Sequence, residues 1–458
     1  MQQLFDEVAS LDKRCYDEFF LSEDILMEHA AQGMASYIRK KFPKNSKVVI
    51  VCGGGNNGAD GIVLARILHK DYCVGIFYAQ KPKSQMALLQ QKRAISIGVM
   101  ELQEVQECVV LVDAIFGSGF SGELSQELQD IISQMNQIDA FKIACDIPTA
   151  LLFRADTTLT MGALKKQLFL DKAKDVVGEI EVIDLGVSRD VYEKESKYKL
   201  LDFSDMCLPF RQKKNSNKGN FGHLALALGQ KSGASIMSAL SALRFGSGLV
   251  SLVGYENITL PHSLMYSHEV PANATALAIG MGLGDEFSTL ELNKFLDNSL
   301  PIVVDADMFY KKEILNILKR DEVVLTPHPK EFSSLLKITS IADVSVEELQ
   351  ERRFYFVEEF CKKYPKATLL LKGANVIIAR ADSLYINPHG SVALAKGGSG
   401  DVLSGLIGAL LAQGYSTLDA AVNGSLAHTK LSCDYRGANF SLTPDDLIEG
   451  IKNLRGLN

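Results

Sequence analysis

Short apolar runs alternate with helix-length amphipathic segments along most of this chain of 458 residues. Strands that are separated by helices pair into parallel sheets, which helices cover on both faces. Because a domain usually contains roughly 100–200 residues, the length indicates more than one domain. The sequence therefore predicts two consecutive α/β domains. The expected strands are 47–52, 73–78, 109–112, 141–145 and 180–183, followed by 224–228, 249–253, 276–279, 302–304, 323–325, 368–371 and 376–379.

One amphipathic helix is expected before the first strand. Ser22 is a suitable N-cap, and Ile25, Leu26, Met34 and Ile38 follow it at helical spacing. A polar stretch rich in lysine and asparagine, 211–220, separates the two series of strands and is read as a linker. The expected domains are residues 1–208 and 209–458. Further helices are expected at 84–97, 124–138, 236–245 and 402–413.

Composition and charge exclude several classes of partner. The 55 acidic residues outnumber the 48 basic ones, so the net charge of −7 offers no basic surface for nucleic acid or an anionic membrane. No apolar run reaches the roughly 18 residues of a membrane-spanning helix. The eight cysteines are scattered without metal-site spacing, and the N-terminus lacks the features of a signal peptide. We expect a cytoplasmic protein that forms a homo-oligomer.

A glycine-rich loop follows the first predicted strand. Gly53, Gly55 and Gly58 match the spacing of a dinucleotide-binding loop, in which backbone amides approach a pyrophosphate. The second predicted strand ends without the acidic residue that usually holds the ribose, so standard NAD binding for hydride transfer is disfavoured. The loop is instead crowded with small polar side chains, Asn56, Asn57 and Asp60.

Polar residues also follow two other strands of the first half. Asp113 ends one apolar run, Asp146 ends another, and Thr149 lies three residues further on. Ligands of doubly wound sheets bind at the carboxyl ends of the strands, so these groups are expected to converge with Asn57. Such oxygen groups suit an alkali or alkaline-earth cation better than zinc. A simple capping role for each aspartate is the alternative.

With these motifs the first half resembles the YjeF N-terminal family, epimerases of hydrated nicotinamide cofactors. The resemblance rests on Asn56-Asn57-Gly58-Ala59-Asp60-Gly61, Asp113-Ala-Ile-Phe-Gly-Ser-Gly and Asp146-Ile-Pro. It implies a Rossmann-like three-layer fold, potassium ligands at Asn57, Asp113 and Thr149, and Asp146 as the catalytic acid or base. The substrate contacts that it implies are Asn56, Asn57, Gly58, Ala59, Asp60, Gly117, Ser118, Gly119, Phe120, Ser121, Gly122, Glu123 and Asp146.

The chain departs from that family at two places. Ala59 stands where the family usually has glycine, and Thr149-Ala150 replaces a serine–glycine pair. Threonine keeps the hydroxyl oxygen, whereas Ala150 has less backbone freedom than glycine.

The second half contains no P-loop, and a different glycine-rich loop precedes its last predicted helix. Gly397-Gly398-Ser399-Gly400 supplies backbone amides at a helix N-terminus, which can bind an anion, and Asp401 lies beside them. A carboxylate there could take a proton from a hydroxyl that attacks a phosphoryl group. A helix cap is the alternative for Asp401. Lys372 and His328 each follow a strand, where either a ligand contact or a solvated side chain is expected.

The second half resembles the carbohydrate-kinase-like dehydratase family, which repairs the same hydrated cofactors. The ordered motifs include Gly280-x-Gly-x-Gly, Asp305-Ala-Asp307, Thr-Pro-His328-Pro-x-Glu, Lys372-Gly-Ala-Asn and Gly-Gly-Ser-Gly400-Asp401. The resemblance implies a ribokinase-like α/β fold with Asp401 as the catalytic base. It implies substrate contacts at Ala234, Gly282, His328 and Asp401, and nucleotide contacts at Lys372, Gly373, Ala374, Asn375, Val376 and Gly400.

The two resemblances together imply a bifunctional repair enzyme. Its first domain would interconvert the R and S epimers of hydrated NADH and NADPH, called NADHX and NADPHX, and its second would dehydrate the S epimer with ADP. Potassium and magnesium ions are the implied cofactors. Two other hypotheses remain open: a ribokinase-like kinase of a small hydroxylated vitamin precursor, and a non-catalytic ligand-binding first domain.

Overall fold

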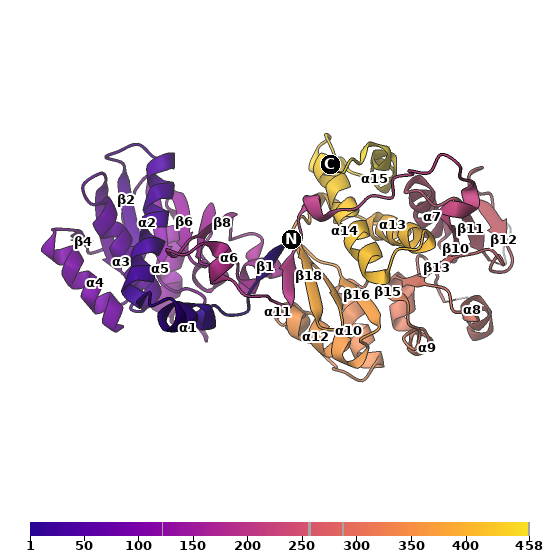
Figure 1. The fold of residues 1–458 in the computed structure, drawn as a ribbon, viewed down its shortest axis with the longest axis horizontal. Helices are drawn as coiled ribbons and strands as arrows, with labels where there is room; N and C mark the ends of the chain where they lie inside the picture. Colours follow the sequence, from indigo (N-terminus) through magenta and orange to yellow (C-terminus); the bar gives the residue numbers. More distant parts are fainter. Residues whose placement is uncertain (121, 255–257, 286–287, 457–458) are drawn as a thin grey trace. The chain divides into compact units, whose positions relative to one another are not determined.

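The computed structural model describes residues 1–120, 122–254, 258–285 and 288–456, which divide into two compact units (Figure 1). Gln3–Ser196 form one unit, and Lys197–Asn458 form the other together with Met1–Gln2. Residues 197–208, expected at the end of the first domain, lie in the C-terminal unit because strand β9 (Tyr198–Leu200) pairs in parallel with strand β18 (Ser383–Asn387). The amino group of Met1 lies 2.8 Å from Oδ1 of Asp205 in the same unit.

The N-terminal unit contains a seven-stranded sheet in the order β4-β3-β2-β5-β6-β7-β8, with every neighbouring pair parallel. The strand order reverses between β2 and β5, so loops after these two strands diverge and leave a ligand site at the sheet's carboxyl edge. The strands are β2 (Lys47–Cys52), β3 (Cys73–Tyr78), β4 (Met100–Leu102), β5 (Val110–Ala114), β6 (Phe141–Cys145), β7 (Thr157–Met161) and β8 (Glu179–Ile183).

Both faces of this sheet are buried. Along β2, Val48, Ile50 and Cys52 face one apolar cluster, which includes the inward sides of α2 (Glu23–Lys41) and α3 (Asn56–Leu68). Val49 and Val51 face a second cluster that includes residues of α5 (Gln126–Gln137). Because side chains alternate along a strand, this separation is what a sheet between two helical layers requires. The predicted Rossmann-like three-layer arrangement is confirmed.

Serine caps account for several helix starts, and the cap predicted at Ser22 is confirmed. The hydroxyls of Ser22, Ser84 and Ser125 each accept a hydrogen bond from the backbone amide three residues later, at the starts of α2, α4 (Gln85–Ser96) and α5. The prediction of one helix before the first long strand was wrong, because α1 (Ala9–Glu18) precedes α2 and a short strand, β1 (Gln2–Leu4), precedes both. Strand β7 was also not predicted, since its three threonines interrupt the apolar pattern although β-branched residues favour strands.

The C-terminal unit contains a sheet that runs β9-β18-β17-β16-β15-β14-β13-β10-β11-β12. Neighbouring strands from β16 to β12 are parallel, and β17 is antiparallel to both β16 and β18. The order reverses between β10 and β13. The other strands are β10 (His223–Ala227), β11 (Leu249–Val253), β12 (Met265–Ser267), β13 (Ala276–Ile279), β14 (Ile302–Val304), β15 (Val323–Leu325), β16 (Ala367–Leu371) and β17 (Val376–Arg380).

Helix α13 (Ser399–Ala412) is the central helix of the C-terminal unit. It packs between α7 (Ser232–Arg244) and α14 (Thr417–Asp434) and over β13 and β14. A Cβ on Gly405 would lie 1.9 Å from Oγ of Ser241, so the close approach of α7 and α13 requires glycine there. The remaining helices are α6 (Arg189–Tyr192), α8 (Thr289–Leu296), α9 (Ile314–Ile317), α10 (Pro329–Ile338), α11 (Val346–Glu351), α12 (Arg353–Lys363) and α15 (Pro444–Gly450).

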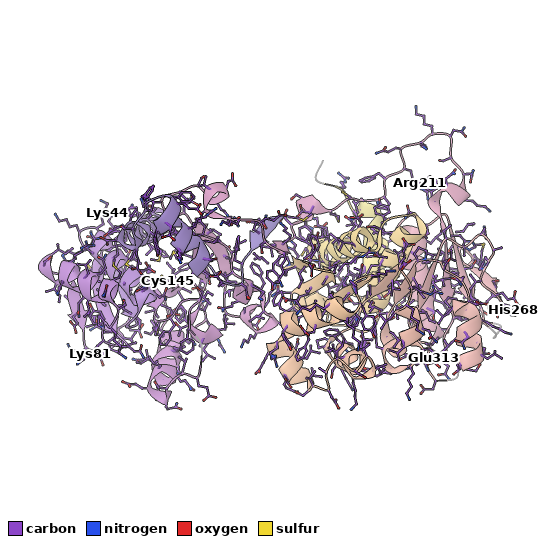
Figure 2. The ribbon with its side chains drawn as sticks, turned by 60° about the horizontal axis from the view of Figure 1, so that its bottom comes forward. Lys44, Lys81, Cys145, Arg211, His268 and Glu313 are labelled. Atoms are coloured by element: carbon purple, nitrogen blue, oxygen red, sulfur yellow. The ribbon has the colours of Figure 1, made fainter. Side chains whose placement is uncertain are left out.

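The predicted linker lies on the surface of the C-terminal unit, and two cysteines lie in the core of the N-terminal unit. The stretch 211–220, on which Figure 2 marks Arg211, is exposed. The prediction that it links the two domains was wrong, because it lies within the C-terminal unit. Cys52 and Cys145 are buried free thiols in strands β2 and β6. Among the described residues, no helix combines the length and apolarity needed to cross a bilayer.

Candidate functional site

The first site lies where loops leave the carboxyl ends of β2, β5 and β6. Asn57 is in the first turn of α3 after β2, and Asp113 is the last residue but one of β5. Asp146 and Thr149 follow β6, whose last residue, Cys145, is labelled in Figure 2. All three strands are parallel, so these residues reach the same edge of the sheet beside the reversal of strand order. A Cβ on Gly53 would lie 2.0 Å from the carbonyl oxygen of Ile115, which explains the need for glycine where these loops meet.

Asp113 and Thr149 form one buried hydrogen-bonded pair. The hydroxyl of Thr149 donates to Oδ1 of Asp113 at 2.7 Å, and the Thr149 amide donates to Oδ2 at 2.8 Å. The amide of Ile115 also donates to Asp113, at 3.1 Å. Burial raises the pKa of Asp113 to about 6 against the lowering effect of these three donors. The carboxyl is therefore charged at neutral pH in a place where water does not reach it.

The loop 116–118 joins this pair to Asp146 and Asn57. The amide of Phe116 donates to Oγ1 of Thr149 at 3.2 Å, and the amide of Ser118 donates to Oδ2 of Asp146 at 3.0 Å. Between them, a Cβ on Gly117 would lie 2.8 Å from Oδ2 of Asp146 and 3.3 Å from Oδ1 of Asn57. The structure thus brings Asn57, Asp113, Asp146, Thr149 and the 116–118 loop together, as the sequence predicts.

Asp146 pairs with a buried lysine that the sequence did not single out. Nζ of Lys165 lies 2.5 Å from Oδ1 of Asp146, and the Lys165 side chain is 1% exposed. Burial raises the pKa of Asp146, but the Lys165 ammonium and the amides of Ser118 and Met161 lower it by more. The net pKa is therefore below the usual value for aspartate. The backbone of Asp146 has φ of 74°, a left-handed conformation that is strained for aspartate.

The other predicted substrate contacts of this site surround the first turn of α3 and the loop before α5. Nδ2 of Asn56 donates to Oε1 of Glu23 at 2.5 Å. Gly58 packs against the carbonyl of Gly53, Ala59 is buried, and Gly119, Gly122 and Glu123 are exposed. Phe120 stacks on Phe116 with ring centroids 4.4 Å apart. Ser121 lies outside the described residues.

Asp60 also faces this group of charges. Burial raises its pKa well above the usual range, and the charge of Asp146 raises it further. Two carboxyls with pKa values displaced in opposite directions are typical of acid–base sites, since one holds a proton while the other accepts one. The pKa values of Asp60 and Asp146 are displaced in opposite directions in this way.

The oxygen atoms of the first site fit a monovalent cation. Asp113 and Thr149 offer a carboxylate and a hydroxyl, and Asn57 offers the carbonyl oxygen of its side-chain amide, which faces Gly117. Oxygen ligands of this kind are those of alkali and alkaline-earth ions rather than zinc. Among the described residues, no group of three His, Cys, Asp or Glu side chains forms a transition-metal site.

Ala150 adopts a conformation that favours glycine, with φ of 50°. A left-handed alanine costs roughly 1–2 kcal/mol, whereas glycine adds roughly 0.4–1 kcal/mol of unfolded-chain entropy. We expect Ala150→Gly to raise the free energy of unfolding of the N-terminal unit by about 0.5–1 kcal/mol, measured by urea titration of the full chain. Ala140→Gly is the control, since Ala140 is not among the residues with positive φ and its replacement should lower stability. Equal losses in both variants would contradict the argument.

The second site lies at the carboxyl edge of the C-terminal sheet, around the reversal between β10 and β13. The loop after β10 leads to Ala234 in α7, and the loop after β13 contains Gly282. Gly282 has φ of 63°, and a Cβ there would lie 2.4 Å from the carbonyl oxygen of Lys231 and 3.0 Å from Cβ of Ala234. The two predicted substrate contacts Ala234 and Gly282 therefore lie side by side, and glycine is required by both the φ angle and the space.

Lys372 occupies the centre of this site. Its Nζ lies 2.8 Å from Oδ1 of Asp305 and 3.7 Å from Oε2 of Glu331. The hydroxyl of Ser404, in α13, donates to Oδ2 of Asp305 at 2.7 Å. A Cβ on Gly400 would lie 3.4 Å from Nζ of Lys372. The predicted nucleotide contacts Lys372 and Gly400 are thus adjacent, and Asp305 links them to α13.

Asp401 lies in the first turn of α13, beside the Lys372–Asp305 pair. Burial and the charge of Asp305 raise the pKa of Asp401, and the charge of Lys372 lowers it; the net pKa is about 6. The N-terminus of α13 is held in place by α7, because the hydroxyls of Ser238 and Ser241 donate to the carbonyl oxygens of Asp401 and Val402 at 2.6 and 3.0 Å. A carboxyl with a pKa near the working pH, next to free amides of a helix start, is suited to proton transfer beside an anion.

His328 caps helix α10 on the other side of the site. Its Nδ1 accepts a hydrogen bond from the amide of Glu331 at 3.2 Å, and its own amide donates to Oε2 of Glu331 at 2.7 Å. The His328 side chain is 44% exposed, which leaves it room to contact a ligand. Burial lowers the pKa of His328, and the nearby Lys372 charge lowers it further, so the imidazole is neutral at pH 7.

Three polar residues of this site were not selected from the sequence. Asp305 and Glu331 occur in the quoted motifs, but their contacts with Lys372 are visible only in the fold. His428 in α14 lies 3.1 Å from the hydroxyl of Ser399, and burial lowers its pKa to about 4. Of the remaining predicted nucleotide contacts, Gly373, Ala374 and the buried Asn375 lie in the turn between β16 and β17, and Val376 is the first residue of β17.

Comparison with known proteins decides the family. A model described as YjeF-related protein N-terminus matches residues 23–167, and one described as NAD(P)H-hydrate dehydratase matches residues 224–453. A Helicobacter pylori protein named bifunctional NAD(P)H-hydrate repair enzyme is 46% identical, covering 99% of this chain and 100% of that protein. The chain belongs to this family of bifunctional NAD(P)H-hydrate repair enzymes.

Another member of the repair-enzyme family, from Dictyoglomus turgidum, is 31% identical over 97% of this chain and 96% of its own length. A solved structure titled ADP/ATP-dependent NAD(P)H-hydrate dehydratase, from Bacillus subtilis and co-crystallised with ATP and Mg²⁺, is 26% identical. It covers 55% of this chain and 94% of that chain, with a TM-score of 0.47. The two family models match different parts of this one chain, and each matched part contains the strands of one sheet's ligand edge.

Proposed function

We propose that this chain repairs hydrated nicotinamide cofactors by two activities. The N-terminal unit epimerises R- and S-NADHX and the corresponding forms of NADPHX, and the C-terminal unit dehydrates the S epimers with ADP. The observation that carries the proposal is that a chain of this family holds two separate clusters of titratable side chains, Asp146–Lys165 and Asp305–Lys372–Asp401, at the ligand-binding edges of its two sheets.

Asp146 is the acid–base group that we propose for epimerisation. Its ion pair with Lys165 and the Ser118 amide keep it ionised, so it can accept a proton from the substrate. Asp60, whose pKa burial raises, is the carboxyl that we propose as the proton donor. The remaining loop residues 56–60 and 117–123 would bind the substrate through their amides and side chains.

Asn57, Asp113 and Thr149 would hold a potassium ion in the first site. Bound there, the ion supplies positive charge that attracts an anionic group of the substrate. The residues themselves fix the loop 116–118, because Thr149 accepts a hydrogen bond from the Phe116 amide. That loop in turn holds Asp146 through the Ser118 amide.

Asp401 is the proposed base of the second reaction. It takes the proton from the hydroxyl of S-NAD(P)HX while that oxygen attacks the β-phosphoryl group of ADP, which leaves AMP. The amides before and at Gly400 bind the transferring phosphoryl group, and Lys372 lies beside them. Loss of inorganic phosphate from the phosphorylated substrate then restores the reduced cofactor. Ala234, Gly282 and His328 would contact the substrate. The nucleotide would be contacted by residues 372–376 and by Gly400.

Magnesium is expected to enter with the nucleotide. Among the described residues there is no cluster of three acidic or other metal-ligating side chains near Asp401. Mg²⁺ commonly keeps several waters and binds through phosphate oxygens rather than an all-protein cage. Asp305 and Glu331 are the acidic groups beside Lys372. They would contact the magnesium ion on that side of the site.

The test is to mix the full chain with ADP, Mg²⁺, K⁺ and an R/S mixture of NADHX, and to follow the absorbance of reduced nicotinamide. Complete recovery supports both activities. Recovery that stops at the S fraction supports dehydration and identifies the first domain as a ligand-binding module. No recovery with ADP or ATP, together with a stable phosphorylated product from a hydroxylated vitamin precursor, would identify a small-molecule kinase instead.

The rate of dehydration should depend on pH through Asp401. A base with pKa about 6 is protonated below that pH, so kcat is expected to fall about tenfold per unit as the pH decreases below about 6. The measurement is kcat between pH 5 and 8 with S-NADHX. Glu331→Gln is the control, since burial raises the pKa of Glu331 to about 7 and its removal should leave the lower limb in place. A kcat that is constant from pH 5 to 8 would contradict Asp401 as the base.

We also propose a homo-oligomer that acts in the cytoplasm on small molecules alone. The net charge of −7 supports the exclusion of nucleic acid and of anionic membranes as partners. Sedimentation of the purified chain at several concentrations tests the oligomeric state.

A further inference from the structure

Two residues outside the YjeF-related match bear on the first site. Asp12 lies in α1 and Tyr192 ends α6, whereas the family model covers residues 23–167. The hydroxyl of Tyr192 donates to Oδ1 of Asp12 at 2.7 Å, and the Tyr192 side chain is 1% exposed. The same helix α1 contributes Arg14, whose guanidinium donates to the carbonyl oxygen of Tyr192 at 2.6 Å. Helix α1 thus holds both the ring end and the backbone of Tyr192.

Tyr192 packs directly on Gly162. A Cβ on Gly162 would lie 2.5 Å from Cε1 and 2.8 Å from Oη of Tyr192, and Gly162 has φ of 71°. The turn at Gly162 is tight, because the amide of Ala163 donates to the carbonyl oxygen of Met161 at 2.8 Å. The position of this turn is therefore fixed by the ring of Tyr192 on one side and by the end of β7 on the other.

That turn holds both members of the Asp146–Lys165 pair. The amide of Met161 donates to Oδ1 of Asp146 at 3.2 Å. Nζ of Lys165 donates to the carbonyl oxygens of Met161 at 2.8 Å and Ala163 at 3.4 Å. A shift of the turn would therefore move the acid–base carboxylate and its cation together.

We propose that Tyr192 and Asp12 form a positioning pair for the epimerase site, in which Asp12 fixes the Tyr192 ring against Gly162 and so fixes the geometry of Asp146 and Lys165. The pair does not touch the substrate. The inference rests on the proposed epimerase function and adds α1 and α6 to the parts of the chain that set its rate. Small displacements of a catalytic group lower kcat strongly, while binding by other loops persists.

Tyr192→Phe removes one hydroxyl and keeps the packing on Gly162. We expect kcat of epimerisation to fall about tenfold with KM changed less than about twofold. Asp12→Ala should give the same loss, whereas Asp12→Asn should restore most of the rate because its amide oxygen still accepts the Tyr192 hydrogen bond. The double variant Tyr192→Phe/Asp12→Ala should be no slower than Tyr192→Phe alone by more than about twofold, since both break the same contact.

Tyr37→Phe is the matched control. Its hydroxyl lies 2.9 Å from Oγ1 of Thr157 at the other end of β7, so it removes a similar contact far from the Gly162 turn. The ADP-dependent dehydration of S-NADHX by the same preparation reports on the integrity of the chain. A tenfold loss confined to the Tyr192 and Asp12 variants supports the proposal. An unchanged kcat in Tyr192→Phe, an equal loss in Tyr37→Phe, or no rescue by Asp12→Asn would overturn it.

Failure of this inference differs from failure of the proposed function. If the wild-type chain does not convert R-NADHX, the epimerase function is wrong and the positioning role falls with it. If the wild type converts R-NADHX and Tyr192→Phe does so equally fast, the positioning role alone is wrong.

Discussion

Asp146→Asn is expected to lower the rate of NADHX epimerisation by about 10²- to 10⁴-fold, the range typical for loss of a general acid or base. The amide keeps the shape of the side chain and its contact with the Ser118 amide, but it cannot take a proton. The measurement is the conversion of purified R-NADHX, coupled to excess dehydratase activity. Dehydration of the S epimer by the same variant should remain at the wild-type rate.

Because the ammonium group of Lys165 is buried beside Asp146, the test needs a second variant. Loss of the carboxylate leaves Lys165 without its counter-charge, and an unpaired buried charge can destabilise a protein by roughly 3–5 kcal/mol. Asp146→Asn/Lys165→Gln replaces the ion pair with two neutral groups that can hydrogen-bond, so folding should recover while epimerisation stays lost. Asp139→Asn, an exposed aspartate of the same unit, serves as the control with full activity. Rapid epimerisation by a folded Asp146→Asn protein would refute the assignment.

Asp401→Asn is expected to lower the rate of ADP-dependent dehydration by about 10²- to 10⁴-fold and to leave epimerisation unchanged. The side chain would no longer accept the proton of the attacking hydroxyl, although the amides at the start of α13 would still bind the nucleotide. The measurement is kcat and KM for S-NADHX and for ADP. Because the loss concerns the chemical step, kcat should fall while KM for ADP changes little.

The control for Asp401 is Asp445→Asn. Asp445 is exposed in the first turn of α15, in the same unit, and no catalytic role is expected of it. We expect Asp401→Asn to keep the free energy of unfolding of the wild type, because burial and the charge of Asp305 raise the pKa of Asp401. Removing a carboxylate from such a place relieves repulsion. A change in KM for ADP with an unchanged kcat would assign Asp401 to nucleotide binding instead.

The sequence alone determined the fold class and which loops carry the candidate site residues. Apolar runs interrupted by amphipathic helices are local patterns, and their alternation specifies parallel sheets whatever the distant contacts are. Polar residues that follow such runs closely, such as Asn57 and Asp146, must then reach the carboxyl edge of a sheet. The serine caps at Ser22 and Ser84 were equally predictable, since a cap depends on residues three positions apart.

What the tertiary structure alone decided is which distant side chains meet at those edges. Lys165 stands next to Lys166 in the sequence and resembles a solvated lysine, yet the turn at Gly162 buries it against Asp146. Asp305 and Lys372 lie 67 residues apart and meet because β14, β15 and β16 are neighbours in the sheet. Tyr192 of α6 packs on Gly162 while Asp12 and Arg14 of α1 bind it. Strand order and side-chain burial depend on packing of the whole unit, so no local pattern specifies these contacts.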